Sequence, residues 1–429
     1  MMDEKQALVP RLRFPEFLKS GEWEERSLGT QGDFLSSLSG KTAKDFDIGK
    51  AKFIPYMNVF SNTFSDVRDL RAVDVAEGES QNAVAKGDVF FTVSSETPED
   101  AGMSSVLLEA IDNCYLNSFC AMFRFYNKRS PNPVFLGYWL RSGLVRAHLS
   151  RGAQGATRYN ISKPVFREVP LLLPRPQEQQ KIANCLSSLD ALIAAQSDKV
   201  DALKTHKKGL MQQLFPREGE AVPRLRFSEF RDAGEWRKCK LEEMAKRGSG
   251  HTPNKKYPSY YNGGIKWVSL ADSDKLDNGY IFKTKHEISE AGLKNSSAVL
   301  HSSGTVILSR DAGVGKSGVL YSPMAVSQHF IAWSCKKAKL SNWFLYYFLQ
   351  KMKPTFESIA VGNTIKTIGL SYFKVMSIVV PAVEEQQKIA DCLLSLDALI
   401  AAHTEKLESL KSLKKGLIQQ LFPSLESSK

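Results

Sequence analysis

The chain has 429 residues, which is too long for one ordinary hydrophobic core, so two or three domains are expected. With 42% hydrophobic and 24% charged residues, the composition excludes a largely disordered chain and is typical of a globular protein. Lysine and arginine exceed aspartate and glutamate by 58 to 46, and the net charge of +12 favours a polyanionic partner such as nucleic acid, although general solubility explains it equally well.

The N-terminal sequence and the cysteines indicate which cellular location and which kinds of metal site to expect. The N-terminal sequence MMDEKQALVPRLRF lacks the apolar stretch of a signal peptide, and no run approaches the roughly 20 apolar residues that span a bilayer, so a cytoplasmic location is expected. No Cys-x-x-Cys pair occurs and no histidine stands at zinc-ligand spacing, which predicts no metal site. The cysteines are expected to be buried, reduced thiols: Cys114, Cys120, Cys185, Cys239, Cys335 and Cys392.

The first globular stretch, residues 1–175, has a mixed α and β pattern. Ser39–Asn62 leads into a predicted strand, FIPYMNV, and Gly87–Leu108 predicts two strands around a turn. A helix is predicted over Pro133–Leu149, with its aromatic side chains in the core rather than stacked on bases. Polar turns at Gly152–Ser162 then lead to a short apolar strand, VPLLLP.

Two loops of this stretch carry side chains that donate to phosphates and base edges. An ordinary solvated loop is the alternative for each. The candidate DNA-binding residues are Lys41, Thr42, Lys44, Lys52 and Asn58 in the first loop region, and Gln154, Thr157, Arg158, Tyr159 and Asn160 in the second.

A long helix is predicted over residues 176–216. Its apolar residues recur in alternate steps of four and three, which is a heptad seam. Glu178 near the start, Lys207 and Lys208 near the end and the terminating Pro216 complete the helix signals, while Gln196 and Lys207 are polar seam positions that can set register. The predicted seam residues are Ile182, Leu186, Leu189, Ile193, Val200, Leu203, Leu210 and Leu214.

The second globular stretch, residues 217–380, has the same order of elements. A loop rich in Gly, Pro, Asn and Tyr precedes the predicted strand IKWVSL, Gly304–Leu320 predicts two strands around a glycine turn, and Ser341–Lys353 predicts a helix. A polar turn, Val361–Gly369, leads to the strand SIVVP. The candidate DNA-binding residues here are His251, Thr252, Asn254, Lys255, Lys256, Tyr260, Arg310, Lys316, Ser317, Asn363, Thr364 and Lys366.

A second long helix, residues 381–423, repeats the first, and residues 424–429 form a tail. Glu178–Pro216 and Glu385–Pro423 are identical at 28 of 39 positions, which chance does not produce. A second, shorter repeat, VPRLRF followed by Gly-Glu-Trp, occurs at Val9–Trp23 and at Val222–Trp236. Polar His403 and Lys414 interrupt the second seam, whose residues are Ile389, Leu393, Leu396, Ile400, Leu407, Leu410, Leu417 and Leu421.

Two nearly identical seams in one chain are best buried against each other. If a pseudo-two-fold axis relates the repeats, the helices form an antiparallel coiled coil with a globular domain at each end. Each helix would be roughly 55 to 60 Å long, more than one turn of duplex DNA, so two different domains on this rod would read two short sequences at a fixed separation. The alternative is that each helix packs only on its own domain.

These motifs resemble those of type I restriction-modification specificity subunits over nearly the whole chain. The repeated elements are PRPQEQQKIA and PAVEEQQKIA, Leu-Asp-x-Leu-Ile, and Lys-Lys-Gly-Leu-x-Gln-Gln-Leu-Phe-Pro. In the second half, HTPNKKYPSYYNGGIKWVSLAD and GVGKSGV also resemble that family's target-recognition domain. The first half departs from this pattern, because its segment SSETPEDAGMSS lacks the Gly-Lys. The resemblance implies two target-recognition domains, a double-stranded DNA target split into two unlike half-sites, and two adenine-methyltransferase subunits as partners. ATP-dependent restriction and translocation subunits would join that complex.

The sequence predicts no catalytic residues. No Asn-Pro-Pro-aromatic, Asp-Pro-Pro-Tyr or Phe-x-Gly-x-Gly element occurs, so any methyl donor, ATP and Mg²⁺ are expected in partner subunits, and no cofactor is expected in this chain. AGVGKS at Ala312–Ser317 has Arg310 where a phosphate-binding loop needs glycine, and a strand rather than a helix is predicted after it. The alternatives are an enzyme with its own activity and a coiled-coil scaffold that joins two proteins without reading DNA. Neither the bases read nor the spacer length follows from the sequence.

Overall fold

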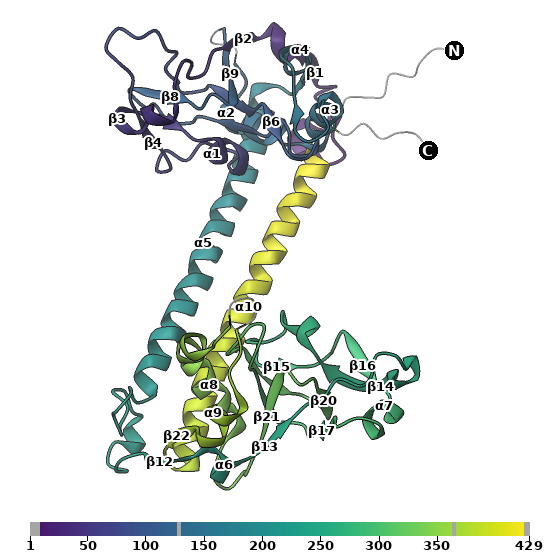
Figure 1. Cartoon of the computed structure of the whole chain (residues 1–429). Helices are drawn as coiled ribbons and strands as arrows, with labels where there is room; N and C mark the ends of the chain where they lie inside the picture. The colour runs from purple at the N-terminus through teal and green to yellow at the C-terminus, as the bar shows by residue number, and fades with distance from the viewer. Residues whose placement is uncertain (1–8, 127–129, 363–365, 424–429) are drawn as a thin grey trace. The chain divides into compact units, whose positions relative to one another are not determined.

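The computed structural model describes residues 9–126, 130–362 and 366–423. The chain divides into two compact units (Figure 1). Unit 1 takes in the described residues up to Ser197 and from Glu405 onward, and unit 2 takes in Asp198–Thr404. Each unit therefore combines one globular stretch with parts of both long helices. The predicted tail, residues 424–429, lies outside the described residues.

The two long helices, α5 (Pro176–Leu214) and α10 (Val383–Leu421), have 39 residues each. Each is one continuous helix (Figure 1). None of the sixteen predicted seam residues is exposed, which confirms the heptad interpretation.

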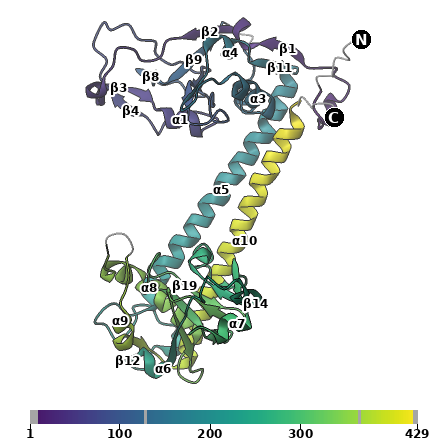
Figure 2. The ribbon, with the colours of Figure 1, turned by 45° about the vertical axis from the view of Figure 1, so that its right-hand side comes forward.

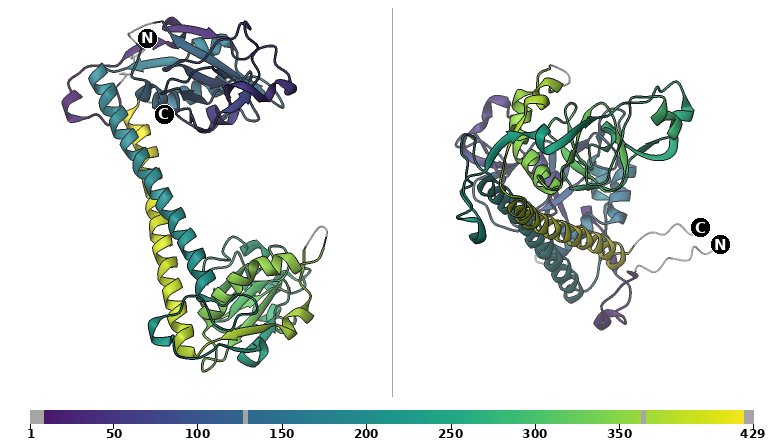
Figure 3. Two further views of the ribbon diagram at one scale, coloured as in Figure 1. Left: turned by 90° about the vertical axis from the view of Figure 1, so that its left-hand side faces the viewer. Right: turned by 90° about the horizontal axis from the view of Figure 1, so that it is seen from below.

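Within each unit the two helices run antiparallel. In unit 1 the end of α10 lies beside the start of α5 (Figure 3), because Leu421 shares a core cluster with Ile182. In unit 2 the end of α5 lies beside the start of α10, because Leu214 shares a cluster with Ile389. The alternative, in which each helix packs only on its own domain, is therefore wrong.

A partly buried polar contact fixes the register of the helices in each unit. In unit 1, Asp190 of α5 accepts hydrogen bonds from Tyr138 Oη at 2.6 Å and from Lys414 Nζ of α10 at 2.5 Å. Lys414 Nζ also lies 5.3 Å from the centre of the Tyr138 ring. Burial raises the pKa of the Tyr138 hydroxyl, which therefore stays protonated and donates. Unit 2 repeats this contact with Tyr347, Asp397 and Lys207.

The globular part of unit 1 is built on a four-stranded sheet of order β2-β9-β5-β7 and a three-stranded sheet of order β4-β3-β8. Two two-stranded sheets, β1-β11 and β6-β10, complete it, and β1 and β11 lie near the start of α5 (Figure 2). The strands are β1 Glu24–Ser27, β2 Gly32–Leu35, β3 Phe46–Ile54, β4 Arg71–Val73, β5 Val89–Thr92, β6 Ser94–Ser95, β7 Ser104–Val106, β8 Cys114–Leu116, β9 Cys120–Phe125, β10 Tyr159–Asn160 and β11 Pro170–Leu173. The helices are α1 Tyr56–Ser61, α2 Pro133–Leu140, α3 Gly143–Gly152 and α4 Lys163–Arg167.

The globular part of unit 2 has a five-stranded sheet of order β13-β21-β18-β19-β15, a four-stranded sheet of order β16-β14-β20-β17 and the pair β12-β22. The strands are β12 Arg237–Lys240, β13 Ala245–Ser249, β14 Tyr261–Val268, β15 Tyr280–Ile281, β16 His286–Ile288, β17 Leu300–His301, β18 Val306–Ser309, β19 Ser317–Leu320, β20 Met324–Val326, β21 Phe330–Cys335 and β22 Ser377–Val380. The helices are α6 Leu241–Met244, α7 Glu290–Lys294, α8 Asn342–Ile359 and α9 Leu370–Val375. Both units are mixed α/β, as the sequence predicts.

Two predicted elements of unit 1 need correction. The segment FIPYMNV is not one strand, because β3 ends at Ile54 and the short helix α1 begins at Tyr56, with Pro55 as its N-cap. The helix predicted over Pro133–Leu149 is two helices that break at Arg141. The buried Arg141 guanidinium donates to backbone carbonyls of α1 and β7, and burial lowers its pKa to about 10, so it stays charged at neutral pH.

The repeated VPRLRF and Leu-Phe-Pro segments close the core of each unit. In unit 1, Phe422 packs against Trp23 and Trp139, whose ring centres lie 6.3 and 5.6 Å from its own. Leu12 N donates to the Gln420 carbonyl at 2.9 Å, so the N-terminal segment covers the last turn of α10. Phe215, Trp236 and Phe344 form the matching cluster of unit 2. The aromatic residues of the predicted helices lie in these cores, as expected.

Three properties of the described part of the chain bear on function. Cys114 and Cys120 are buried and the other four cysteines are partly buried, and all six are free thiols. No helix in residues 9–126, 130–362 and 366–423 is long and apolar enough to cross a membrane. The same residues contain no group of three or more His, Cys, Asp or Glu side chains placed to hold a metal ion.

Candidate nucleic-acid interface

A short hairpin carries the predicted loop residues of unit 1. Gln154 and Asn160 exchange two backbone hydrogen bonds of 2.9 and 2.8 Å, and β10 then pairs with β6. Gly155 is required in the hairpin, since its φ is +150° and an added Cβ would lie 1.8 Å from the Arg158 carbonyl oxygen. The hairpin leaves Gln154, Thr157, Arg158 and Asn160 exposed and Tyr159 partly buried.

Unit 2 contains the equivalent hairpin. Val361 and Thr367 exchange backbone hydrogen bonds of 3.1 and 2.9 Å, and Thr367 forms a bridge with Asp311, as β10 does with β6. Lys366 is exposed beside this bridge. Asn363 and Thr364 lie outside the described residues.

A three-residue turn lies next to each hairpin: Asn117–Phe119 before β9 and Ser327–His329 before β21. Val93 N donates to the Phe119 carbonyl at 3.1 Å, and Arg310 N donates to the His329 carbonyl at 2.9 Å. Each turn is joined to the preceding parallel strand in the same way, by bonds of 3.2 Å from Asn117 N to the Ile54 carbonyl and 2.9 Å from Ser327 N to the Val268 carbonyl. The two units therefore place different side chains on the same backbone frame.

In unit 1 this frame surrounds a cavity of about 450 Å³. Its apolar lining includes Phe119 and Met57, which are 61% and 57% exposed. The rings of Tyr56 and Phe60 stack beside them, with centroids 5.9 Å apart. The polar lining residues are Ser94, Ser95, Glu96, Asp100 and Arg158. Exposed phenylalanine and methionine side chains that share one cavity indicate a binding surface.

In unit 2 the same frame carries hydrogen-bonding groups. His329 Nδ1 lies 2.7 Å from Asp311 Oδ1, and the Thr252 hydroxyl donates to the amide oxygen of Gln328. Arg310 Nε donates to the Gln328 carbonyl at 3.2 Å, so its guanidinium is held against the turn. Arginine, glutamine and threonine side chains read base edges by hydrogen bonds. This site therefore carries His329, a hydrogen-bonding side chain, at the position where unit 1 carries the exposed ring of Phe119.

The predicted basic residues differ in how available they are. Lys41 forms a 2.5 Å ion pair with Glu79, and this contact contributes most to a Glu79 pKa of about 2. The Thr42 hydroxyl bonds to Asp45. Lys44, Lys52, His251, Asn254, Lys255 and Lys256 are exposed, whereas Tyr260 is partly buried. None of the unit 1 lysines lines the cavity.

Three predicted residues are held by the protein itself. Asn58 is fully buried, and its amide donates to the Asp66 and Asp69 carbonyls at 2.8 Å each. Ser317 is also fully buried, and its hydroxyl lies 2.7 Å from Gln350 Nε2. Lys316 Nζ donates to the Ser273 carbonyl. Because a buried side chain presents no surface to DNA, we remove Asn58 and Ser317 from the candidate interface.

The turn between β18 and β19 lacks the strand-to-helix geometry of a phosphate-binding loop. The residue after the Gly-Lys begins the strand Ser317–Leu320, which pairs antiparallel with β18. A phosphate-binding loop instead ends at a helix N-terminus, whose free amide groups bind the phosphates. The strand predicted after AGVGKS is therefore confirmed.

The sequence did not indicate several residues of the unit 1 cavity and of the corresponding site in unit 2: Tyr56, Met57, Phe60, Phe119, Asp311, Gln328 and His329. The segments NSF and SQH that form the two turns contain no motif. The turns are shown to be equivalent by their long-range backbone bonds, to Ile54 and Val93 in unit 1 and to Val268 and Arg310 in unit 2. In the sequence the two turns share only their position directly before a strand, β9 in unit 1 and β21 in unit 2. This shared position is visible only after the strands of the two units have been aligned.

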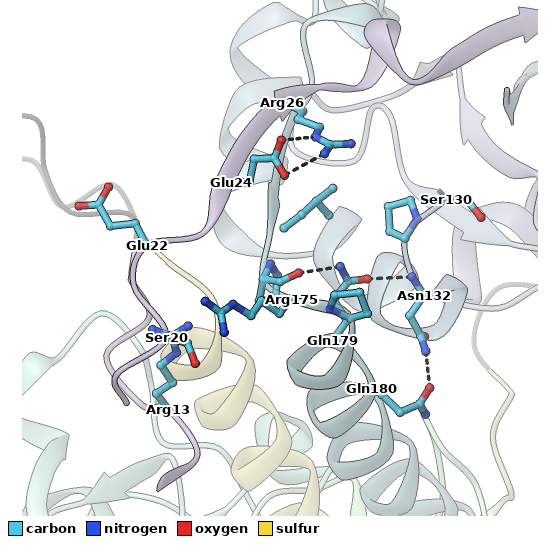
Figure 4. A pocket seen from close by; sticks show the side chains of 14 residues that line it. Arg13, Ser20, Glu22, Glu24, Arg26, Ser130, Asn132, Arg175, Gln179 and Gln180 are labelled. Atoms are coloured by element: carbon cyan, nitrogen blue, oxygen red, sulfur yellow. Dashed lines mark hydrogen bonds and ion pairs between the residues drawn. The ribbon is translucent and has the colours of Figure 1, made fainter. Parts of the chain in front are cut away.

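A second surface occurs in both units, at the base of the long helices. In unit 1 it is a cavity of about 770 Å³, and its lining includes Arg13, Glu22 and Arg175 (Figure 4). In unit 2 the matching cavity has about 560 Å³ and contains Arg226 and Glu235 at the equivalent repeat positions. In each cavity one lining arginine forms a buried ion pair, Arg13 with Glu178 in unit 1 and Arg226 with Glu385 in unit 2.

Comparison with known proteins identifies the family. Residues 21–205 and 233–412 each match the description "Type I restriction modification DNA specificity domain". The chain belongs to this family. Its relatives include the putative type I restriction enzyme MjaX specificity subunit of Methanocaldococcus jannaschii, which is 26% identical over 94% of this chain and 93% of the relative. The MjaVIII specificity subunit of the same organism is 26% identical over 67% of this chain and 69% of its own length.

Solved structures show the same fold. The S subunit of a type I restriction-modification system from M. genitalium has a TM-score of 0.55 and 14% identity, and the match covers 97% of this chain and 100% of that one. A chain from a study of type I R-M complex assembly and conformational transition has a TM-score of 0.61 and 17% identity, covering 94% and 98%. The resemblance stated from the sequence is thus confirmed, and the chain is a specificity subunit rather than a catalytic subunit.

Proposed function

We propose that each unit reads one half of a bipartite, asymmetric DNA target. The observation that carries this proposal is the shared backbone frame with unlike side chains at the Asn117–Phe119 and Ser327–His329 turns. A common frame docks each domain on duplex DNA in the same way, whereas different side chains select different bases.

Phosphate contacts position the units in this proposal. Lys255, Lys256 and Arg158 are exposed, and none of them forms an ion pair with a carboxylate of the described residues. Unpaired cations neutralise phosphates and release counterions, so binding should weaken steeply as salt rises. Replacing Arg158 or Lys366 is expected to weaken DNA binding while leaving the helices and their partner surface intact.

The repeated surfaces support two copies of one partner. The helices and the cavities at their bases recur in both units, with Arg13 and Glu22 matched by Arg226 and Glu235. A repeated surface binds the same structure twice, and an adenine-methyltransferase subunit on each unit fits this requirement. Restriction and translocation subunits would join through them. The methyl donor, ATP and Mg²⁺ would belong to those subunits and not to this chain.

The decisive experiment co-expresses the chain with its methyltransferase subunit in a host without DNA methylation and maps modified adenines across the genome. A motif of two unrelated parts with a constant gap is the expected result, and exchanging one globular stretch should change one part only. If the complex assembles and no duplex binding or methylation appears, the coiled-coil scaffold is the better explanation.

A further inference from the structure

The cavity of unit 1 combines two kinds of surface that rarely occur together. Phe119 and Met57 give it an exposed apolar rim, and Glu96 and Asp100 place carboxylates on its wall. Glu96 has no ion-pair partner among the described residues, so its oxygens are open acceptors. The matching position of unit 2 has His329 in place of Phe119.

The lining has two carboxylates, Glu96 and Asp100, against the one guanidinium of Arg158, so its net charge is negative and phosphates do not suit the interior of this cavity. Base edges do. In the major groove an A·T pair presents an adenine amino group, which donates hydrogen bonds, and, beyond the thymine O4 acceptor, the apolar thymine 5-methyl group. A carboxylate beside an exposed phenylalanine matches both features at once. No other base pair offers an apolar group in that groove.

We propose that Phe119, supported by Met57, reads the thymine 5-methyl group of an A·T pair in the half-site of unit 1. Glu96 accepts a hydrogen bond from the adenine amino group of the same pair. At the equivalent place in unit 2, Gln328 and His329 read a base edge by hydrogen bonds alone. This inference rests on the proposed DNA-reading function and assigns one contact within it.

The position of Phe119 supports a fixed contact rather than a mobile one. Its carbonyl accepts from Val93 N at 3.1 Å, and Asn117 Oδ1 accepts from Phe119 N at 2.9 Å. Cys120 N closes the turn on the Asn117 carbonyl at 3.0 Å. The backbone is therefore held on both sides of a side chain that is 61% exposed. Removing the ring leaves the core of the unit unchanged.

The test uses the complex of this chain with its methyltransferase subunit and a duplex carrying the mapped wild-type target. Each thymine of the unit 1 half-site is replaced in turn by uracil, which lacks only the 5-methyl group. At one position uracil is expected to weaken binding roughly fourfold, the value of one buried methyl group. With Phe119→Ala, thymine and uracil duplexes should bind equally.

Tyr126→Ala is the matched control, because Tyr126 is 57% exposed beyond the far end of the same strand, β9. This variant should keep the fourfold preference, and uracil in the unit 2 half-site should not distinguish wild type from Phe119→Ala. Equal binding of all uracil duplexes by the wild-type complex overturns the inference, as does a preference that survives Phe119→Ala. An apolar wedge between bases would give the first of these results. Failure of the wild-type complex to select any two-part target would instead refute the proposed function.

Discussion

Removing one partner of the ion pair between Arg13 and Glu178 is expected to destabilise unit 1 strongly, because the pair is buried and bidentate. Arg13 Nε and NH2 each donate to a Glu178 carboxylate oxygen at 2.7 Å, and the two side chains are only 4% and 1% exposed. A third bond joins Arg13 NH1 to the Gly21 carbonyl at 2.6 Å. The pair thus ties the N-terminal segment to the first turn of α5.

Replacing Glu178 with glutamine leaves the Arg13 charge buried without a counterion. Breaking a buried pair in this way costs about 3 to 5 kcal/mol, and we expect the lower end because the amide oxygen still accepts one bond. The free energy of unfolding of unit 1 should fall by about 3 kcal/mol in urea denaturation, followed through hydrogen exchange of the β1 and β11 amides. An apolar pair, Arg13→Met with Glu178→Leu, should recover most of the loss.

The control is a nearby pair that joins the same segments at the surface. Lys181 Nζ lies 3.0 Å from Glu16, with side chains 51% and 45% exposed, so solvent screens the contact. Glu16→Gln should change the stability of unit 1 very little. If Glu178→Gln is no more damaging than Glu16→Gln, burial is not what makes the Arg13 contact strong, and the reasoning fails.

Three further predictions concern unit 1. Gly155→Ala places an added Cβ 1.8 Å from the Arg158 carbonyl oxygen, so DNA binding in a mobility-shift assay should weaken roughly fivefold or more. The control is Gly143→Ala, whose added Cβ has nothing within 4 Å, and this variant should bind DNA normally. Arg158→Ala should lower the slope of log affinity against log salt by about 1, and an unchanged slope would remove this residue from the phosphate contacts. The Glu79 pKa is lowered from 4.5 to about 2 chiefly by Lys41, so this pair stabilises the fold above pH 4.5 and loses that effect as pH falls toward 2. In Lys41→Met the Glu79 pKa should rise in an NMR titration, and acid denaturation should depend less on this carboxylate.

The sequence alone determined the parts of the protein that depend on local pattern. A 28 of 39 identity and a heptad seam are periodic signals, and they predicted two long helices whose seam residues are all at least partly buried. The same repeat predicted the family, and the absence of motifs predicted a chain without its own catalytic site. In the globular parts the sequence indicated only some of the strands, at FIPYMNV, Gly87–Leu108 and VPLLLP and at IKWVSL, Gly304–Leu320 and SIVVP, and it missed the break at Arg141 and the end of β3 at Ile54.

Only the tertiary structure decided which residues meet. Asn58 and Ser317 have polar side chains in loop-like sequence, yet distant carbonyl and amide groups hold them in the interior. Conversely, Phe119 reads in the sequence as one more core aromatic, because exposure depends on neighbours that lie far away along the chain. The equivalence of the Phe119 and His329 positions rests on backbone bonds to Val93 and Arg310, and such long-range pairings leave no periodic trace in the sequence.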